Sequence, residues 1–378
     1  MPAWEENDGR NISDKLKDFP QPPTYSRESE PDELSADFAR ILPPICLREG
    51  SFIKRSLSEF HDLFITQFEA RKKLMTIQIP SMVLVILMAS AIGGKQTLGP
   101  WTPPQNLGCG TSTPAGVNSA FDDLAPAVSK DGSSLYFGST RPTAPDDVVL
   151  DANLWVSQWN AESENWGPPA FLGTTLNSPG ADNVPALSRD GHWLFFNSDR
   201  PGGQGGVDIW VSWREKVHDD FGWEAPVNLG PLVNTPIFDG GASYFENDDG
   251  GAPQLFFTSG PTQLSTDIYV SELQNGAWGS PTRIDELSTP QFFDARPSVR
   301  FDGLELFMFS NRSGQSDLWS STRESTDDPW SEPTNLGAVV NSSSNEQQPY
   351  ILADRRTLMF VSNRTGGCGG FDIYATTR

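Results

Sequence analysis

The chain has 378 residues, with 27 Lys and Arg against 49 Asp and Glu, and its formal net charge is −22 at pH 7. Residues 92–378 hold 16 of the basic and 35 of the acidic residues, and such a surface repels nucleic-acid phosphate, which argues against nucleic-acid binding. Three Cys and three His without CxxC or HxxxH spacing argue against a zinc site. The 34 Gly and 31 Pro favour many turns and short strands over long helices.

The first 74 residues are polar and rich in proline, and they are predicted to be a disordered extension. Apolar residues at spacings of three and four between Ser56 and Leu74 permit one amphipathic helix there. The sequence shows no core against which that helix would pack.

A basic flank, a short apolar stretch and an A-x-A site follow at residues 71–73, 77–89 and 89–91. This pattern predicts that residues 75–94 are a signal peptide cleaved after Ala91, or else an uncleaved membrane anchor. The apolar stretch is shorter than the roughly 20 residues of a membrane span. Both alternatives export residues 95–378 to the periplasm or the cell exterior. Because a signal normally begins a chain, translation from Met75 is an alternative start that would make residues 1–74 a mis-assigned extension.

Five repeats follow, and each begins with a tryptophan that precedes a proline by three residues. Successive tryptophans are separated by 65, 57, 55 and 52 residues. Leu-Gly follows in four of the repeats, and the fourth repeat has Ile284-Asp285 instead. The pairs are Trp101/Pro104, Trp166/Pro169, Trp223/Pro226, Trp278/Pro281 and Trp330/Pro333.

Each repeat then reads as three short strands, of which the first two are joined by a tight turn. Asp-Gly pairs form four of these turns, because glycine accepts the positive φ that such hairpins require, and Asp354-Arg355 is the weak copy. The first strands, which would line the axis of a ring, are predicted at 126–129, 185–188, 242–245, 297–300 and 349–352. The third strands carry Asp-Ile-Tyr or a variant of it, as in Asp208-Ile209-Trp210.

In these motifs the chain resembles the WD40-like, TolB-type propeller repeat, which joins a "P-x-x-S-x-D-G-x-x-L-Y-F-x-S-x-R" stretch to "D-I-Y-V-S". The resemblance covers residues 101–378 and implies an all-β, five-bladed β-propeller over residues 95–378. The chain ends after a third strand, so the last blade lacks its outer strand, and the strand at 101–107 is spare. We expect this N-terminal strand to pair into the last blade and close the ring, which removes an open edge.

Ring closure also brings two cysteines near each other. Cys109 follows the closing strand, and Cys368 lies in the loop before the third strand of the same blade. Both loops fall on one face of the ring, so the sequence predicts a Cys109–Cys368 disulfide in an oxidising compartment, with two free thiols as the alternative.

A carboxylate stands three residues before each predicted inner strand, where the connection opens on one face of the ring, here called the funnel face. A Ser-x-Arg motif follows the second strand in four repeats, and the third repeat has Ser259-Gly260-Pro261 instead. These residues are candidate ligand-binding groups, or they form structural ion pairs that each blade needs. If the acids converge without partners, some stay protonated or a cation such as Ca²⁺ sits among them. The set is Asp123, Asp182, Asp239, Asp294, Glu346, Arg141, Arg200, Arg312 and Arg364.

The resemblance implies an exported scaffold that binds a protein, glycan or other cell-envelope partner through the funnel face. No residue pair stands out as nucleophile or acid–base couple, and fold alone does not fix function. The alternative is a carbohydrate-active glycoside hydrolase or lyase that uses two of the funnel carboxylates, with or without Ca²⁺.

Overall fold

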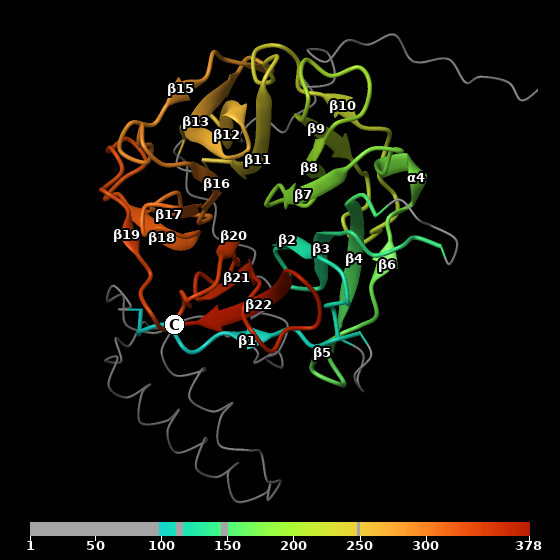
Figure 1. The fold of residues 1–378 in the computed structure, drawn as a ribbon. Helices are drawn as coiled ribbons and strands as arrows, with labels where there is room; N and C mark the ends of the chain where they lie inside the picture. Colours follow the sequence, from blue (N-terminus) through green and yellow to red (C-terminus); the bar gives the residue numbers. More distant parts are fainter. Residues whose placement is uncertain (1–97, 111–115, 145–149, 248–249) are drawn as a thin grey trace, which may run out of the picture. The chain divides into compact units, whose positions relative to one another are not determined.

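The computed structural model describes residues 98–110, 116–144, 150–247 and 250–378. These residues form five small antiparallel sheets arranged in a ring, which confirms the predicted all-β, five-bladed propeller (Figure 1). The predicted extension at 1–74 and the predicted signal or anchor at 75–94 lie outside the described residues. Within the described part, no helix combines the length and apolar character that a membrane crossing requires.

Each blade has four strands from the axis outward, in chain order in blades 1 to 4, and blades 1 and 3 have an additional fifth strand. Blade 1 consists of β2 (Asp123–Val128), β3 (Ser134–Ser139), β4 (Asn153–Asn160) and β5 (Asn165–Trp166), with β6 (Ala170–Phe171) also paired to β4. Blade 2 consists of β7 (Asp182–Leu187), β8 (Trp193–Ser198), β9 (Asp208–Trp213) and β10 (Val227–Asn228). The single helical turn α4 (Gly173–Leu176) joins these two blades.

Blade 3 consists of β11 (Phe238–Phe245), β12 (Gln254–Thr262), β13 (Ser265–Gln274) and β14 (Ala277–Trp278), with β15 (Thr282–Arg283) also paired to β13. Blade 4 consists of β16 (Asp294–Val299), β17 (Glu305–Ser310), β18 (Asp317–Thr322) and β19 (Thr334–Asn335). Blade 5 consists of β20 (Glu346–Ile351), β21 (Thr357–Ser362), β22 (Asp372–Thr377) and β1 (Gln105–Asn106).

The ring closes through β1, as the strand order predicts. Gln105 pairs with Ala375 and Asn106 with Tyr374, so the first strand of the described chain completes the last blade. The strand is shorter than the predicted 101–107, although the Thr102 amide also donates to the Thr377 carbonyl at 2.8 Å. The outer edge of β22 is therefore covered rather than left open to another chain.

A disulfide ties the two ends of this closure together. Cys109 and Cys368 are bonded, with 5.5 Å between their Cα atoms and 259 residues between them in the sequence. The bond joins the segment after β1 to the loop before β22, so it fastens the N-terminal strand to the blade that it completes.

The hairpin turns follow the predicted chemistry. Gly132, Gly191 and Gly303 have φ of 75°, 77° and 70°, a conformation that glycine adopts without steric cost. In the weak copy, Arg355 adopts φ of 63°, so a residue with a side chain takes the glycine position.

The hydrophobic core consists of five clusters, each of which joins two neighbouring blades. Trp223, for example, belongs to the cluster between blades 1 and 2, where its ring meets Tyr136 edge-on at 6.0 Å. The other repeat tryptophans occupy the remaining interfaces in the same way. Large aromatic side chains contribute most of the apolar area in such sheet-on-sheet packing, so the tryptophan repeat serves the packing between blades.

Candidate functional site

The inner strands begin three residues earlier than predicted, and four in blade 3, at or beside the repeated carboxylate. Asp123, Asp182, Asp294 and Glu346 are the first residues of β2, β7, β16 and β20, and Asp239 is the second residue of β11. The prediction placed four of the strand starts at a proline and that of the third repeat at Ala242. In the structure, a register shift in each inner strand lets the ladder continue on both sides of a bulge.

All five carboxylates are buried, with an exposed fraction of 0%, and four of them pair with an arginine of their own blade. Arg200 contacts Asp182 at 2.5 Å. The other pairs are Arg141 with Asp123, Arg312 with Asp294 at 3.0 Å, and Arg364 with Glu346 at 3.0 Å.

Blade 2 shows how completely such a pair is enclosed. Asp182 Oδ2 accepts hydrogen bonds from the Ser178 amide at 2.5 Å and the Ser178 hydroxyl at 2.8 Å. Arg200 also donates to the Leu176 carbonyl at 2.5 Å, and its guanidinium lies 5.1 Å from the ring centre of Trp210. The pair therefore connects the loop that precedes β7 with β7 itself and with the end of β8. This is a structural role for the ion pair.

Blade 3 lacks the arginine, and its acid has a different environment. Asp239 Oδ2 accepts from the Thr235 amide at 2.5 Å and from the Thr235 hydroxyl at 2.7 Å, and the Ser259 side chain also forms a hydrogen bond with this carboxyl group. Burial raises the pKa of the Asp239 carboxyl, because the charged form loses its hydration and no cation replaces it.

The sequence allowed a Ca²⁺ ion on the condition that the acids converge without partners, and the described acids do not meet that condition. Among the described residues, no three acidic, histidine or cysteine side chains come together. Ca²⁺ requires six to eight oxygen ligands, whereas each carboxylate here is bonded within its own blade. The acids and arginines predicted as funnel ligands thus form closed contacts, and their part in ligand binding stays a prediction.

The axis of the ring is lined instead by the bulge residue two positions after each acid. All five have positive φ, between 47° and 64°, which turns the side chain out of the regular alternation of the strand. They are Ala125, Val184, Gly241, Arg296 and Gln348. Together with their neighbours they enclose a central cavity of about 40 Å³.

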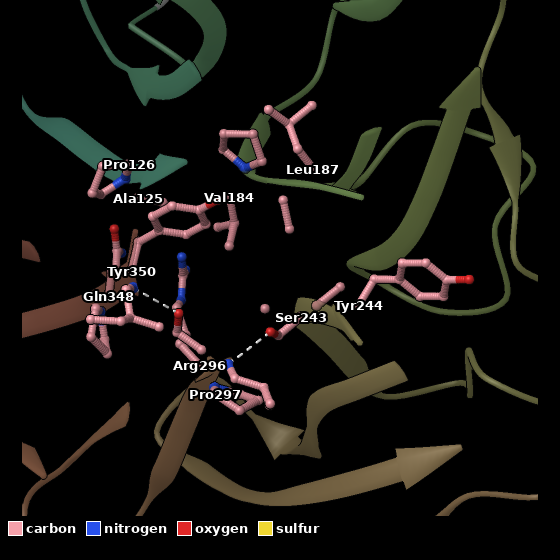
Figure 2. A pocket seen from close by; sticks show the side chains of 18 of the residues that line it. Ala125, Pro126, Val184, Leu187, Ser243, Tyr244, Arg296, Pro297, Gln348 and Tyr350 are labelled. Carbon is pink, nitrogen blue, oxygen red and sulfur yellow. Dashed lines mark hydrogen bonds between the residues drawn. The ribbon is translucent and has the colours of Figure 1, made fainter. Parts of the chain in front are cut away.

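Arg296 is the only one of these five residues that carries a charge. Figure 2 shows its side chain extending from β16 into the space between the inner strands. Its stem passes over Gly241, where an added Cβ would lie 3.1 Å from Arg296 Cγ, so blade 3 leaves room for the arginine by having glycine.

Arg296 is half-buried, no carboxylate within the described ranges pairs with it, and its Nη1 is buried without a hydrogen-bond partner. Burial lowers the pKa of Arg296 to about 9 because the guanidinium loses hydration. The group therefore remains charged at neutral pH. Gln348, which is 8% exposed, also has an amide oxygen, Oε1, without a partner.

Arg296 and Gln348 also line a second hollow, of about 120 Å³, which lies at the funnel-face ends of blades 3 and 4 and is here called the funnel pocket. Its walls include Phe238, Phe293 and Leu264. Leu264 lies at the tip of the β12–β13 hairpin, which is longer than the equivalent hairpins and occupies the blade that lacks the Ser-x-Arg motif.

The rim of the funnel pocket is apolar and exposed. Leu264, which lines the pocket, is 77% exposed. Exposed apolar groups around a hollow mark interaction surfaces more often than scattered single residues do. The asymmetric region of the propeller is thus a pocket with an apolar rim and a cationic floor.

Sequence reasoning missed Arg296 and Gln348 because it concentrated on residues that recur in every repeat. The sequence nevertheless contains a signal for this position. When the five repeats are aligned on their acids, the residue two positions later is Ala, Val, Gly, Arg and Gln in turn. A position that changes while its neighbours repeat is where a symmetric fold becomes specialised.

Comparison with protein-family models and with curated protein sequences gives no match. Among solved structures, an α-L-arabinofuranosidase from Podospora anserina in complex with cellotriose is 13% identical, with a TM-score of 0.51 over 74% of this chain and 96% of that one. TolB from Acinetobacter baumannii is 14% identical, with a TM-score of 0.40 over 65% of this chain and 53% of that one. At such identities the likeness concerns the fold alone, and a fold by itself does not fix a function.

Proposed function

We propose that this chain is an exported, non-catalytic scaffold that binds a protein or glycan partner of the cell envelope through the funnel face. The proposal rests on the burial and the ion pairing of the repeated carboxylates. All five are fully buried, and four are charge-paired with an arginine of their own blade. A glycosidase needs two carboxyl groups that reach the sugar from either side of the bond, and these groups are already engaged.

Export is part of the proposal, and the disulfide supports it. Disulfides persist in the periplasm or outside the cell, whereas cytosolic thiols are kept reduced. The Cys109–Cys368 bond stabilises the ring closure, so the blade arrangement that presents the funnel pocket depends on an oxidising compartment.

A single observation favours the alternative, a carbohydrate-active hydrolase or lyase. Asp239 has no arginine partner, and burial raises its pKa, which is a property of a general acid. A second unpaired carboxylate would be needed for hydrolysis, and among the described funnel acids the other four are paired.

The test is a binding and activity experiment on the full chain. A polysaccharide screen that follows new reducing ends and unsaturated products is expected to show no turnover for the wild type. Turnover that is lost in Asp239→Asn would refute the scaffold function and support the hydrolase or lyase.

The binding arm uses capture of an envelope partner followed by reconstitution with that partner in purified form. Leu264→Asp, at the hairpin tip on the funnel face, is expected to weaken binding at least tenfold, since it places a charge in the apolar rim. Phe221→Asp is the matched control, because Phe221 is 57% exposed and follows β9 at the opposite face of the ring. Equal weakening by both variants would place the binding surface elsewhere.

A further inference from the structure

Arg296 is a cation without a counter-ion at the floor of the funnel pocket. Within the described ranges it makes no ion pair, and its only hydrogen bond is that of its backbone amide, which donates to the Thr258 hydroxyl at 2.8 Å. Burying a charge without a partner is costly, and the cost is recovered when an anion binds. The four other arginines of the funnel face show how this fold normally uses guanidinium groups, each with a buried carboxylate.

We propose that the funnel pocket binds an acidic peptide segment of a partner protein, with Arg296 as the anchor for a peptide carboxylate. This assignment rests on the proposed function as a binding scaffold and names the chemistry of its partner. The planar guanidinium fork matches a carboxylate, to which it donates two parallel hydrogen bonds. Gln348 Oε1, which is buried without a partner, accepts a backbone N–H beside that carboxylate.

The rim distinguishes a peptide from an acidic sugar. Leu264, the exposed residue of the rim, is aliphatic, whereas Phe293 and Phe309 of the pocket wall are buried, at 8% and 7% exposed. Aliphatic side chains suit the apolar side chains that flank an acidic residue in a peptide, whereas they lack the flat face on which a sugar ring packs. The rim therefore supplies apolar contact area, and Arg296 makes binding depend on a negative charge in the peptide.

The size of the hollow limits what enters it. The funnel pocket of about 120 Å³ and the central cavity of about 40 Å³ share Arg296 and Gln348 as lining residues. This space accommodates one side chain or a chain end rather than a folded element. The carboxylate has two possible sources, the side chain of Asp or Glu and the free C-terminus, and the experiment separates them.

The test is titration calorimetry on the oxidised full-length chain with defined probes. Acetyl-Leu-Glu-Leu amide is compared with acetyl-Leu-Gln-Leu amide, and acetyl-Leu-Leu with a free carboxylate is compared with its amide. We expect one acid in these two pairs to bind at least about tenfold more tightly than its neutral analogue. The pair that shows the difference identifies the source of the carboxylate.

Two variants tie the effect to the pocket. Arg296→Gln is expected to bind the acidic and neutral probes equally and weakly, while Arg356→Gln, which removes a charge from an exposed turn of blade 5, is expected to bind like the wild type. Thermal unfolding of both variants checks that the fold is retained. Because the variant removes the charge of a half-buried guanidinium that has no ion pair, Arg296→Gln is not expected to unfold the protein.

The remaining outcomes overturn the inference in distinguishable ways. If acidic and neutral probes bind alike, Arg296 is not a carboxylate anchor, although the scaffold function stands. Trigalacturonate, an acidic trisaccharide, is titrated as a further probe. If it alone binds, and if Arg296→Gln abolishes that binding, the peptide assignment is wrong. If trigalacturonate is cleaved, the proposed function itself fails. Absence of binding by every probe also overturns the inference.

Discussion

Asp182 and Asp239 occupy equivalent positions in blades 2 and 3, and the same substitution to Asn is expected to affect them differently. Asp182→Asn leaves the Arg200 guanidinium, which is 12% exposed, without its carboxylate. Breaking a buried ion pair by removing one partner costs about 3–5 kcal/mol, because the remaining charge stays buried and uncompensated. Residual contacts of Arg200 with the Leu176 carbonyl and Ser198 place the expected loss near the lower end, about 3 kcal/mol.

Asp239→Asn removes a carboxylate that has no arginine partner. The Thr235 amide and hydroxyl donate to Oδ2, and an amide oxygen accepts both bonds equally well. The free energy of unfolding is therefore expected to change by less than about 1 kcal/mol at neutral pH.

The two variants also differ in their dependence on pH. Burial raises the pKa of Asp239 in the folded state, so ionisation of this carboxyl lowers the free energy of unfolding. This loss is absent below the unfolded-state pKa of about 3.9 and develops as the pH rises through the folded-state pKa. Relative to the wild type, Asp239→Asn should therefore gain stability between acidic and neutral pH.

Urea unfolding of the oxidised chain, followed by tryptophan fluorescence at several pH values, measures both effects. The slope of the free energy against urea concentration should stay constant, which shows that the folded and unfolded states keep their compactness. Equal losses in the two variants, or a larger loss for Asp239→Asn, would refute the conclusion that the arginine makes the repeated carboxylates structural.

Three further predictions concern the closure and the axis of the ring. Cys109→Ser with Cys368→Ser is expected to lower the free energy of unfolding by about 5 kcal/mol, since the bond closes a loop with a sequence separation of 259, and a loss under about 1 kcal/mol in chemical unfolding would contradict this. Arg296→Met is expected to raise the free energy of unfolding by about 1 kcal/mol because it removes the charge of a half-buried guanidinium that has no ion pair, and clear destabilisation in the same assay would show that the guanidinium is structural. Gly241→Ala is expected to lower the free energy of unfolding by about 1–2 kcal/mol, because a Cβ is strained at φ of 64° and approaches Arg296 Cγ to 3.1 Å. In a double-mutant cycle, Arg296→Ala should restore only the part of this loss that is due to the contact with Arg296.

The repeat pattern was sufficient to predict most of the architecture. A spare strand before the first repeat and a missing outer strand after the last imply closure through the last blade, because unpaired strand edges are unfavourable. The observed pairing of Gln105 with Ala375 is that closure. The starts of the inner strands were predicted three residues too late, and four in blade 3, because each strand continues past a bulge that the repeat pattern did not indicate.

The sequence by itself determined which residues repeat, and through them the fold, because each blade needs the same turn glycines, aromatic strands and outer-strand prolines. Only the tertiary structure decided how the repeated polar groups are used. Whether a carboxylate faces a ligand or an arginine depends on distances between residues 18 positions apart, as with Asp182 and Arg200, and on the bulge that turns Arg296 toward the axis. A linear pattern carries the identity of such groups, whereas their pairing and burial arise from the packing of strands that meet only when the ring has formed.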